Sequence, residues 1–209
     1  MPTDLELIKE LEKEIGKKLE KKTEIRYKDA YEGAYQTDED GHVTRIALEI
    51  TNLKEIPRSL LRFKELEYLS FHENEIKKLP PEIRQLTNLT ELYLFANQLT
   101  SLPPEIGQLT NLTILDLPSN QLTSLPPEIG QLTNLTKLSL YSNQLTSLPP
   151  EIGHLTNLTE LSLHSNQLTS LPSEFIKLTK LARIELHENP LIQPPPKLPE
   201  RGLRQYSSI

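Results

Sequence analysis

Three histidines occupy the same position of an internal repeat and are the residues best placed for chemistry. His72, His164 and His187 each stand at position 7 of a 23-residue unit, and the last two lie in consecutive units. If consecutive units stack as strands, about 5 Å separates the backbones of these two histidines. Glu185 and Glu188 would lie nearby, and two imidazoles with carboxylates could bind a transition metal or transfer protons.

A histidine on an open surface is also a large, adaptable contact residue, and we favour this interpretation. Acid–base catalysis generally uses a closed pocket that excludes water, which an open concave sheet does not provide. The sequence lacks a Gly-rich phosphate loop, G-x-S-x-G and H-E-x-x-H. It contains no cysteine, which excludes thiol nucleophiles, disulfides and zinc–thiolate sites. We therefore predict that the chain is not an enzyme and has no catalytic residue, metal site or cofactor.

The charge balance narrows the class of partner. The 209 residues carry a net charge of -6, with a pI near 5.5, whereas nucleic acids and acidic membranes favour basic patches. No apolar run approaches the ~20 residues that cross a bilayer, and the N-terminal stretch is too charged for a secretory signal. Together with the absence of cysteine, these features favour a cytoplasmic protein.

A 23-residue period determines how the candidate residues are positioned. Asparagines recur at this spacing at Asn74, Asn97, Asn120, Asn143, Asn166 and Asn189. The units that start at Leu89, Leu112 and Leu135 are identical at 18 of 23 positions. Apolar residues stand at positions 1, 4, 6, 11, 14, 18 and 21, and the alternation around positions 3 to 7 predicts a strand. Such a strand must pair with that of the next unit, which predicts a parallel sheet of stacked coils.

Three other positions indicate how each coil closes. The asparagine at position 9 can donate and accept, so it can satisfy backbone groups between successive coils. Positions 15 to 17, such as Pro103-Pro104-Glu105, predict the start of a short helical or 3₁₀ segment. We interpret Gly107, Gly130 and Gly153 as loop positions that need a permissive backbone.

The consensus LxxLxLxxNxLxxLPxEIGxLxx resembles the leucine-rich repeat of the 23-residue intracellular type. Similar repeats occur in Scribble- and erbin-like scaffolds, plant Ras-group proteins, bacterial leucine-rich repeat proteins and Roco GTPases. The resemblance implies an α/β solenoid, a right-handed arc with a parallel β-sheet on its concave face and short helical or 3₁₀ segments on its convex face. It covers seven units over 43–196, with a degenerate first unit (Thr51 in the asparagine place) and a degenerate last one (Pro194 and Arg201).

The ends are expected to close the stack, with an N-terminal cap over 1–42 and a C-terminal cap or tail over 197–209. Residues 3–22 predict an amphipathic helix that begins with a capping box at Thr3 and Glu6. Its apolar stripe would comprise Leu5, Ile8, Leu11, Ile15 and Leu19. This helix would cover the first coil or, alternatively, mediate dimerisation.

Two terminal segments extend the resemblance. The stretch from Tyr31 to Leu48 is similar to the N-terminal cap of plant receptor leucine-rich repeats, which implies a strand near Tyr35, a turn over 38–41 and a return strand at Val43. The ending NPL-x-x-PP is common in the same families. In those families a short helix after a glycine often closes the solenoid. The residues of this chain that match that segment are Gly202, Leu203 and Tyr206.

The variable positions of the repeat indicate a binding surface. Four of the five positions that differ among the three matched units are positions 3, 5, 7 and 8, expected on the concave face, whereas exposed positions such as Gln98 and Thr100 do not vary. Grouped aromatic residues are usual anchors of protein interfaces. The predicted partner-binding residues are Tyr68, His72, Glu91, Tyr93, Phe95, Ile114, Asp116, Lys137, Tyr141, Glu160, His164, Arg183, Glu185 and His187.

We therefore predict a non-enzymatic module, of the scaffold or signalling type, that binds a protein or peptide on the concave sheet. One alternative is the regulatory region of a larger signalling enzyme, such as a Roco-type GTPase. The near-identical units also fit recent duplication or an engineered consensus scaffold. We expect a monomer that binds neither nucleic acid nor membranes, with dimerisation through the N-terminal helix or a sheet edge as the alternative.

Overall fold

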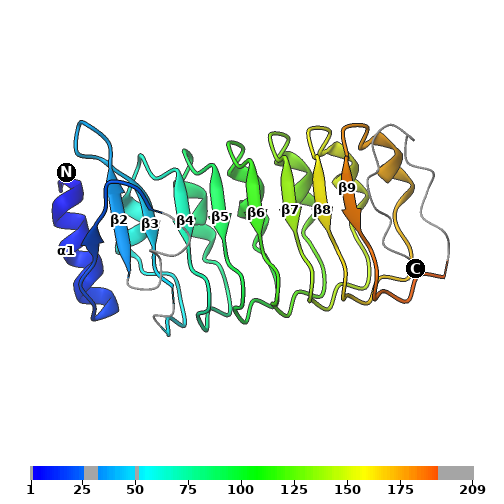
Figure 1. The fold of residues 1–209 in the computed structure, drawn as a ribbon, viewed down its shortest axis with the longest axis horizontal. Coiled ribbons are helices and arrows are strands. Elements are labelled where there is room, and N and C mark those ends of the chain that lie inside the picture. Colours follow the sequence, from blue (N-terminus) through cyan, green and yellow to red (C-terminus); the bar gives the residue numbers. More distant parts are fainter. Residues whose placement is uncertain (1, 26–32, 50–51, 193–209) are drawn as a thin grey trace.

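A computed structural model describes residues 2–25, 33–49 and 52–192. Figure 1 shows a stack of coils that begins at the N-terminal helix, with the strands side by side on one face and the short helical turns behind them. The described residues form one nine-stranded sheet whose strands follow the chain order. Several residues that the sequence singles out at the ends of the repeat region lie outside the described residues: Tyr31, Thr51, Pro194, Arg201, Gly202, Leu203 and Tyr206.

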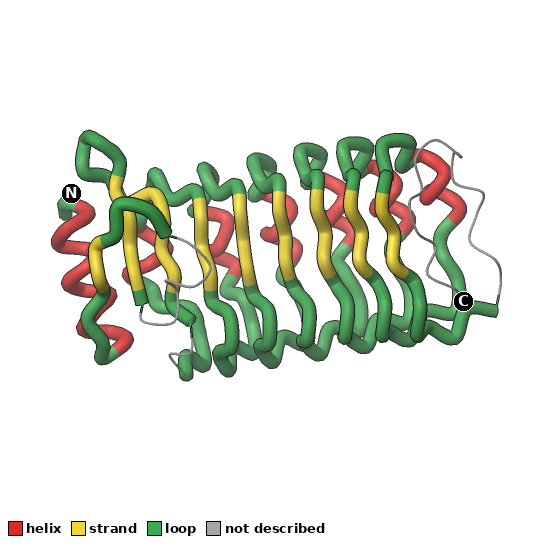
Figure 2. Tube along the Cα trace, in the orientation of Figure 1, coloured by secondary structure: helices red, strands yellow, loops and turns green. Residues whose placement is uncertain are grey.

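The elements alternate regularly, as the tube in Figure 2 shows. One α-helix, α1 (Asp4–Ile15), precedes all the strands. The strands are β1 (Glu20–Lys21), β2 (Ala34–Thr37), β3 (Val43–Ala47), β4 (Tyr68–Ser70), β5 (Glu91–Tyr93), β6 (Ile114–Asp116), β7 (Lys137–Ser139), β8 (Glu160–Ser162) and β9 (Arg183–Glu185). The 3₁₀ turns are η2 (Ser59–Arg62), η3 (Pro81–Gln85), η4 (Pro104–Gln108), η5 (Pro127–Gln131), η6 (Pro150–His154) and η7 (Ser173–Lys177). Within the described ranges, no helix combines the length and apolar character needed to cross a membrane.

The strands of the repeats pair without a register shift. From β3 to β9 every pair is parallel, and equal positions of successive units face each other, as Leu92 and Leu115 do. The predicted core leucines are confirmed: Leu92, Leu115 and Leu138 are fully buried, whereas Ile114 is only half-buried. Because side chains alternate across a strand, this register places positions 3 and 5 on the opposite face from the core.

The repeated asparagine connects its own coil to the preceding one, and the sequence predicts such a bridge between successive coils. The Asn120 Oδ1 atom accepts a hydrogen bond from the backbone N–H of Leu99 in the preceding coil (3.0 Å). Its Nδ2 atom donates to the carbonyls of Leu94, Leu117 and Pro118 at 2.9, 3.1 and 3.2 Å. The buried Leu99 N–H would otherwise lack a partner at the turn, whereas the Pro118 carbonyl also accepts from the Ala96 N–H.

The residue before each asparagine adopts a left-handed backbone, although none of these residues is glycine. Position 8 has φ between 52° and 56° in Glu73, Ala96, Ser119, Ser142, Ser165 and Glu188. A left-handed conformation costs a residue with a side chain about 1 kcal/mol, which the surrounding hydrogen bonds must offset. The N–H of Ala96, for example, donates to the Pro118 carbonyl of the next coil at 3.0 Å. Position 8 therefore varies in side chain but not in backbone conformation.

The glycines of the 3₁₀ turns serve close packing, and the prediction of a special backbone there is wrong. None of them has positive φ, but a Cβ atom on Gly130 would lie 2.6 Å from the carbonyl oxygen of Glu151 in the next turn. The same distance separates a Cβ on Gly107 from Glu128. In η2, Leu61 stands at the repeat position that these glycines occupy. A hollow of about 560 Å³, with Leu61 in its wall, lies between η2 and η3. Glycine thus lets successive turns stack closely on the convex side.

The N-terminal helix is shorter than the sequence predicts. The capping box at Thr3 is present, but α1 ends at Ile15 because Gly16 adopts a left-handed C-cap. Residues 20–21 form the strand β1 instead, and Leu5, predicted in the apolar stripe, is 57% exposed. The buried face consists of Leu7, Ile8 and Leu11, which join the core of the coils.

Polar contacts fix this helix against the first coil. The Glu14 carboxylate accepts hydrogen bonds from the backbone N–H groups of Arg58 and Ser59, at 2.7 and 3.1 Å. Asp4 accepts from the N–H of Val43 at 2.6 Å. The helix therefore covers the end of the stack, and the predicted hairpin follows it as the antiparallel pair β2–β3.

Replacing Leu115 with alanine should lower the free energy of unfolding by about 2–5 kcal/mol, because the side chain is fully buried. Urea unfolding measures the change, and Ile114→Ala, on the next residue of the same strand, is the matched control. A larger loss for Ile114→Ala would contradict the strand register.

Replacing Gly130 with alanine should destabilise the protein by roughly 1–3 kcal/mol, because the added methyl group forces η5 and η6 apart. Exposed Gln131 provides the control, since Gln131→Ala removes side-chain atoms from the same turn without a clash. Equal stability of the two variants would contradict the packing role of the glycine.

Candidate functional site on the concave face of the sheet

The repeat register gathers the variable side chains into rows. We define the concave face as the side of the sheet that carries positions 3, 5 and 7, together with position 8 at its rim. Neighbouring strands lie about 4.8 Å apart, so side chains at one position stack along the solenoid. The open part extends from β5 to β9. The predicted site residues found there are Glu91, Tyr93, Phe95, Ile114, Asp116, Lys137, Tyr141, Glu160, His164, Arg183, Glu185 and His187.

At the N-terminal end this face is covered, and the predicted exposure of two site residues is wrong. Tyr68 and His72 are only 6% and 5% exposed. Ile25, which follows β1, packs in a small hydrophobic cluster with Ala34, Ala47 and Tyr68. The cap therefore places its own apolar side chain where the sequence suggests a free surface. Repeat periodicity alone could not indicate this contact, because Ile25 lies outside the repeats.

Burial changes the acid–base properties of the covered residues. Desolvation raises the pKa of the Glu49 carboxyl to about 7, although Ser70 donates a hydrogen bond to it at 2.7 Å. Desolvation also lowers the pKa of His72 to about 4, so this imidazole is neutral at pH 7. His72 contacts the rings of Tyr93 and Phe95, with centroids 5.6 and 5.7 Å away. The first described coils thus contribute buried polar groups rather than an open binding surface.

An aromatic hollow opens where the covered part ends. It measures about 250 Å³ and is lined by His72, Tyr93, Phe95, Asp116, Lys137 and Tyr141. Burial raises the pKa of the Asp116 carboxyl, while a hydrogen bond with Ser139 and the charge of Lys137 act in the opposite direction. The Tyr93 hydroxyl donates to Glu91 at 2.7 Å, and burial raises the pKa of this phenol. The hollow therefore combines ring faces with a half-buried carboxylate.

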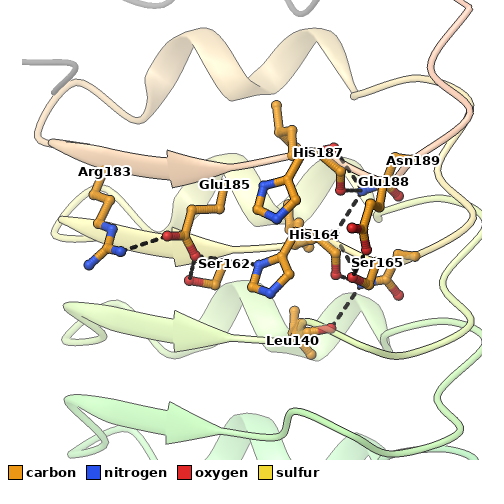
Figure 3. A network of polar contacts seen from close by, with 12 residues as sticks. Leu140, Ser162, His164, Ser165, Arg183, Glu185, His187, Glu188 and Asn189 are labelled. Atoms are coloured by element: carbon orange, nitrogen blue, oxygen red, sulfur yellow. Dashed lines mark hydrogen bonds and ion pairs between the residues drawn. The ribbon is translucent and has the colours of Figure 1, made fainter. Parts of the chain in front are cut away.

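The C-terminal half of the face carries a stack of planar rings. His164 lies between Tyr141 and His187, with 4.5 Å between ring centroids on each side and interplanar angles of 7° and 11°. Figure 3 shows the two imidazoles above one another, beside Glu185. Burial lowers the pKa of His164, and the charge of His187 adds to this effect. The shared position of the histidines therefore has a packing role in this stack.

Hydrogen bonds hold the carboxylate beside this stack. Glu185 accepts from Ser162 at 2.8 Å and from Arg183 at 2.6 Å, and its oxygen lies 3.4 Å from the Nδ1 atom of His164 (Figure 3). Burial alone would raise the pKa of Glu185, but these donors outweigh burial and lower it. The arrangement stabilises an anion on the surface.

His164 and His187, which the sequence suggests as possible metal ligands, do not converge on a common point in the structure. The parallel histidine rings stack face to face, which does not direct their nitrogen lone pairs at a common point. Among the described residues, the group of three side chains whose ligand atoms come together is Asp38, Asp40 and His42, on the turn between β2 and β3. All three are exposed, and His42 Nδ1 already contacts Asp38 Oδ2 at 3.2 Å.

Comparisons with known proteins agree with this architecture. Two family models match the chain, one described as "Leucine-rich repeat region" over residues 92–183 and one as "Leucine Rich repeats (2 copies)" over residues 64–106. An internalin from Listeria monocytogenes is 26% identical, with a TM-score of 0.59, over 66% of this chain and 40% of its own. A leucine-rich repeat protein of Leptospira interrogans is 31% identical, with a TM-score of 0.42, over 67% of this chain and 53% of its own. No curated protein matches.

The two family models and the internalin, together with the solenoid, show that the chain belongs to the leucine-rich repeat family. It spans about half the length, or less, of the two solved structures it resembles. Leucine-rich repeats typically serve protein interaction, and the chain carries such a repeat module. None of these four descriptions names a Scribble-like scaffold or a Roco GTPase. The resemblance to those particular proteins therefore stays a prediction.

The buried Glu49 should make stability depend on pH. Its pKa is raised from 4.5 to about 7 in the folded protein, so the native state holds this proton more tightly than the unfolded chain. The resulting stabilisation is full below pH 4.5 and is lost as the pH rises through 7. Glu49→Gln should therefore increase the free energy of unfolding at pH 8 by about 2 kcal/mol, and the gain should vanish near pH 4.5.

Urea unfolding at pH 4.5, 6 and 8 measures this difference, with Glu82→Gln on the exposed 3₁₀ turn as the matched control. A gain that stays constant with pH would show that the carboxyl of Glu49 is not perturbed by burial.

Proposed function

We propose that the protein is a non-enzymatic module that binds a protein or peptide along the open concave face from β5 to β9. The observation that carries this proposal is the exposure of aromatic and charged side chains on the face that holds four of the five positions at which the matched repeats differ. Tyr93, Phe95 and Tyr141 are only half-buried there, although aromatic residues gain most from removal from water. A partner that covers them would supply that burial.

The rigid register supports recognition in a second way. Hydrogen bonds between coils fix each strand, so the exposed side chains are held in place before a partner arrives. A pre-organised surface loses less conformational entropy on binding, which favours affinity. Charged residues such as Lys137, Glu160 and Arg183 surround the aromatic residues, and complementary charges would set specificity.

The finer features of the protein lie outside this proposal. A cytoplasmic location, a signalling role and a monomeric state remain predictions from the sequence. So does the alternative that this chain is the regulatory region of a larger enzyme of the Roco type. We propose the interaction module itself, which is common to these possibilities.

Phe95→Ala and Tyr141→Ala should each weaken binding by about 1 kcal/mol or more, which corresponds to roughly fivefold in affinity, because each removes an aromatic anchor. The ligands are peptides selected on the wild-type protein from a random displayed library, and calorimetry gives their dissociation constants. Both variants should lose much less stability than Leu115→Ala.

Ile176 offers a matched control, since it is a large apolar residue that is 57% exposed on η7, away from the concave face. Ile176→Ala should leave the affinity unchanged. If the selected peptides bind the two concave-face variants as tightly as the wild type, the placement of the binding surface is wrong.

A further inference from the structure

The concave face already contains one cation held between a ring and a carboxylate. The Arg45 guanidinium carbon lies 3.9 Å from the centroid of the Tyr68 ring. Its Nη1 atom is 3.9 Å from a carboxylate oxygen of Glu91. These residues occupy position 3 of three successive strands, β3, β4 and β5. An aromatic face attracts a cation electrostatically, and a nearby carboxylate strengthens the attraction where water is partly excluded.

The aromatic hollow presents the same chemistry one to two strands further along the sheet. Tyr93 in β5 and Tyr141 after β7 supply rings, and Asp116 in β6 supplies a carboxylate between them. Phe95 adds a third ring to the wall. The hollow thus has the components that hold Arg45, but in an open arrangement that a side chain from another molecule can reach.

One cation already lines this hollow, and its position leaves the carboxylate available. The Lys137 side chain is exposed, and its charge favours the ionised form of Asp116. The ion pairs found within the described part of the chain do not include one between Lys137 and Asp116. A carboxylate can accept about four hydrogen bonds, so the contact with Ser139 leaves capacity for a further donor.

The charge of the whole open face favours a basic partner. Positions 3, 5, 7 and 8 from β5 to β9 carry five carboxylates, which are Glu91, Asp116, Glu160, Glu185 and Glu188. They carry two permanent cations, Lys137 and Arg183, so the difference is three negative charges. Such a surface attracts cationic partners and disfavours acidic ones.

We infer that the aromatic hollow receives a lysine or arginine side chain of the bound peptide. This inference rests on the proposed function, because it names the group that the concave face recognises. The incoming cation lies against the rings of Tyr93 and Tyr141 and pairs with Asp116. Lys137 opposes it through like charge and thereby limits its affinity.

Two small probes test the charge requirement directly. N-acetyl-arginine amide carries the guanidinium, and N-acetyl-citrulline amide is its neutral counterpart of almost the same shape. Titration of ¹⁵N-labelled protein should shift the backbone amides of Tyr93, Asp116 and Tyr141 with the arginine probe. The citrulline probe should bind at least fivefold more weakly.

Variants then assign the effect to the hollow. Asp116→Asn should weaken binding of the arginine probe at least fivefold, whereas Lys137→Ala should strengthen it. Glu82→Gln, which removes a carboxylate from the exposed 3₁₀ turn η3 rather than from the concave face, should leave the affinity unchanged. The opposite responses of Asp116 and Lys137 are not expected from general loss of structure.

The outcomes separate this inference from the proposed function. Equal binding of the two probes, or an unchanged affinity of Asp116→Asn, would overturn the inference. If selected peptides still lose affinity with Phe95→Ala, the binding function stands without a cation site. If arginine binds as expected but no selected peptide depends on Phe95, the hollow is a cation site and the proposed peptide-binding surface is wrong.

Discussion

Every buried backbone group at the turn of a coil must find a hydrogen-bond partner, and the repeated asparagine meets this requirement. Each strand from β4 to β9 has only three residues. The backbone groups of the turn that follows it therefore cannot all find partners within the sheet. The Asn120 side chain bridges its own coil and the one before it, with donors and an acceptor in one planar group. Because the same bridge recurs every 23 residues from Asn74 to Asn189, it fixes the spacing of the coils and the register of the sheet.

This register connects stability to recognition. Since successive strands pair without a shift, each residue on the concave face lies directly beside the residue at the same repeat position in the next strand. Core leucines carry the packing energy, and the residues between them are free to differ. Variation at Tyr93 or Asp116 therefore changes the surface without changing the coil. The leucine-rich repeat family thus separates the residues that fold the chain from those that can bind.

The convex side shows how the same geometry is maintained by close packing. A Cβ atom on Gly107, Gly130 or Gly153 would overlap the next turn. The three turns that contain these glycines each start with a proline, which has no N–H. The strands on the other side carry larger side chains, including stacked rings such as His164 and His187. Small residues therefore let the turns stack closely behind the sheet, while large side chains occupy its other face.

Much of the fold follows from the sequence, because repetition shows local preferences several times. The core positions, the strand register, the asparagine bridges and the 3₁₀ turns are all predicted correctly from the units that contain Leu92 and Leu115. The hairpin after the N-terminal helix is also predicted correctly. The end of that helix is not, since the apolar spacing continues to Leu19 although Gly16 ends the helix and the chain turns back as a strand.

The sequence by itself determined the solenoid and the set of side chains that face away from the core, because both depend on alternation and on a fixed period. Only the tertiary structure decided which of those side chains are accessible. Ile25 covers Tyr68, a contact that joins residues far apart in the chain and follows no period. Tertiary contacts also decided that Asp116 lies between tyrosine rings from neighbouring coils. The distances between such groups depend on how coils stack, and the pattern within one repeat does not contain them.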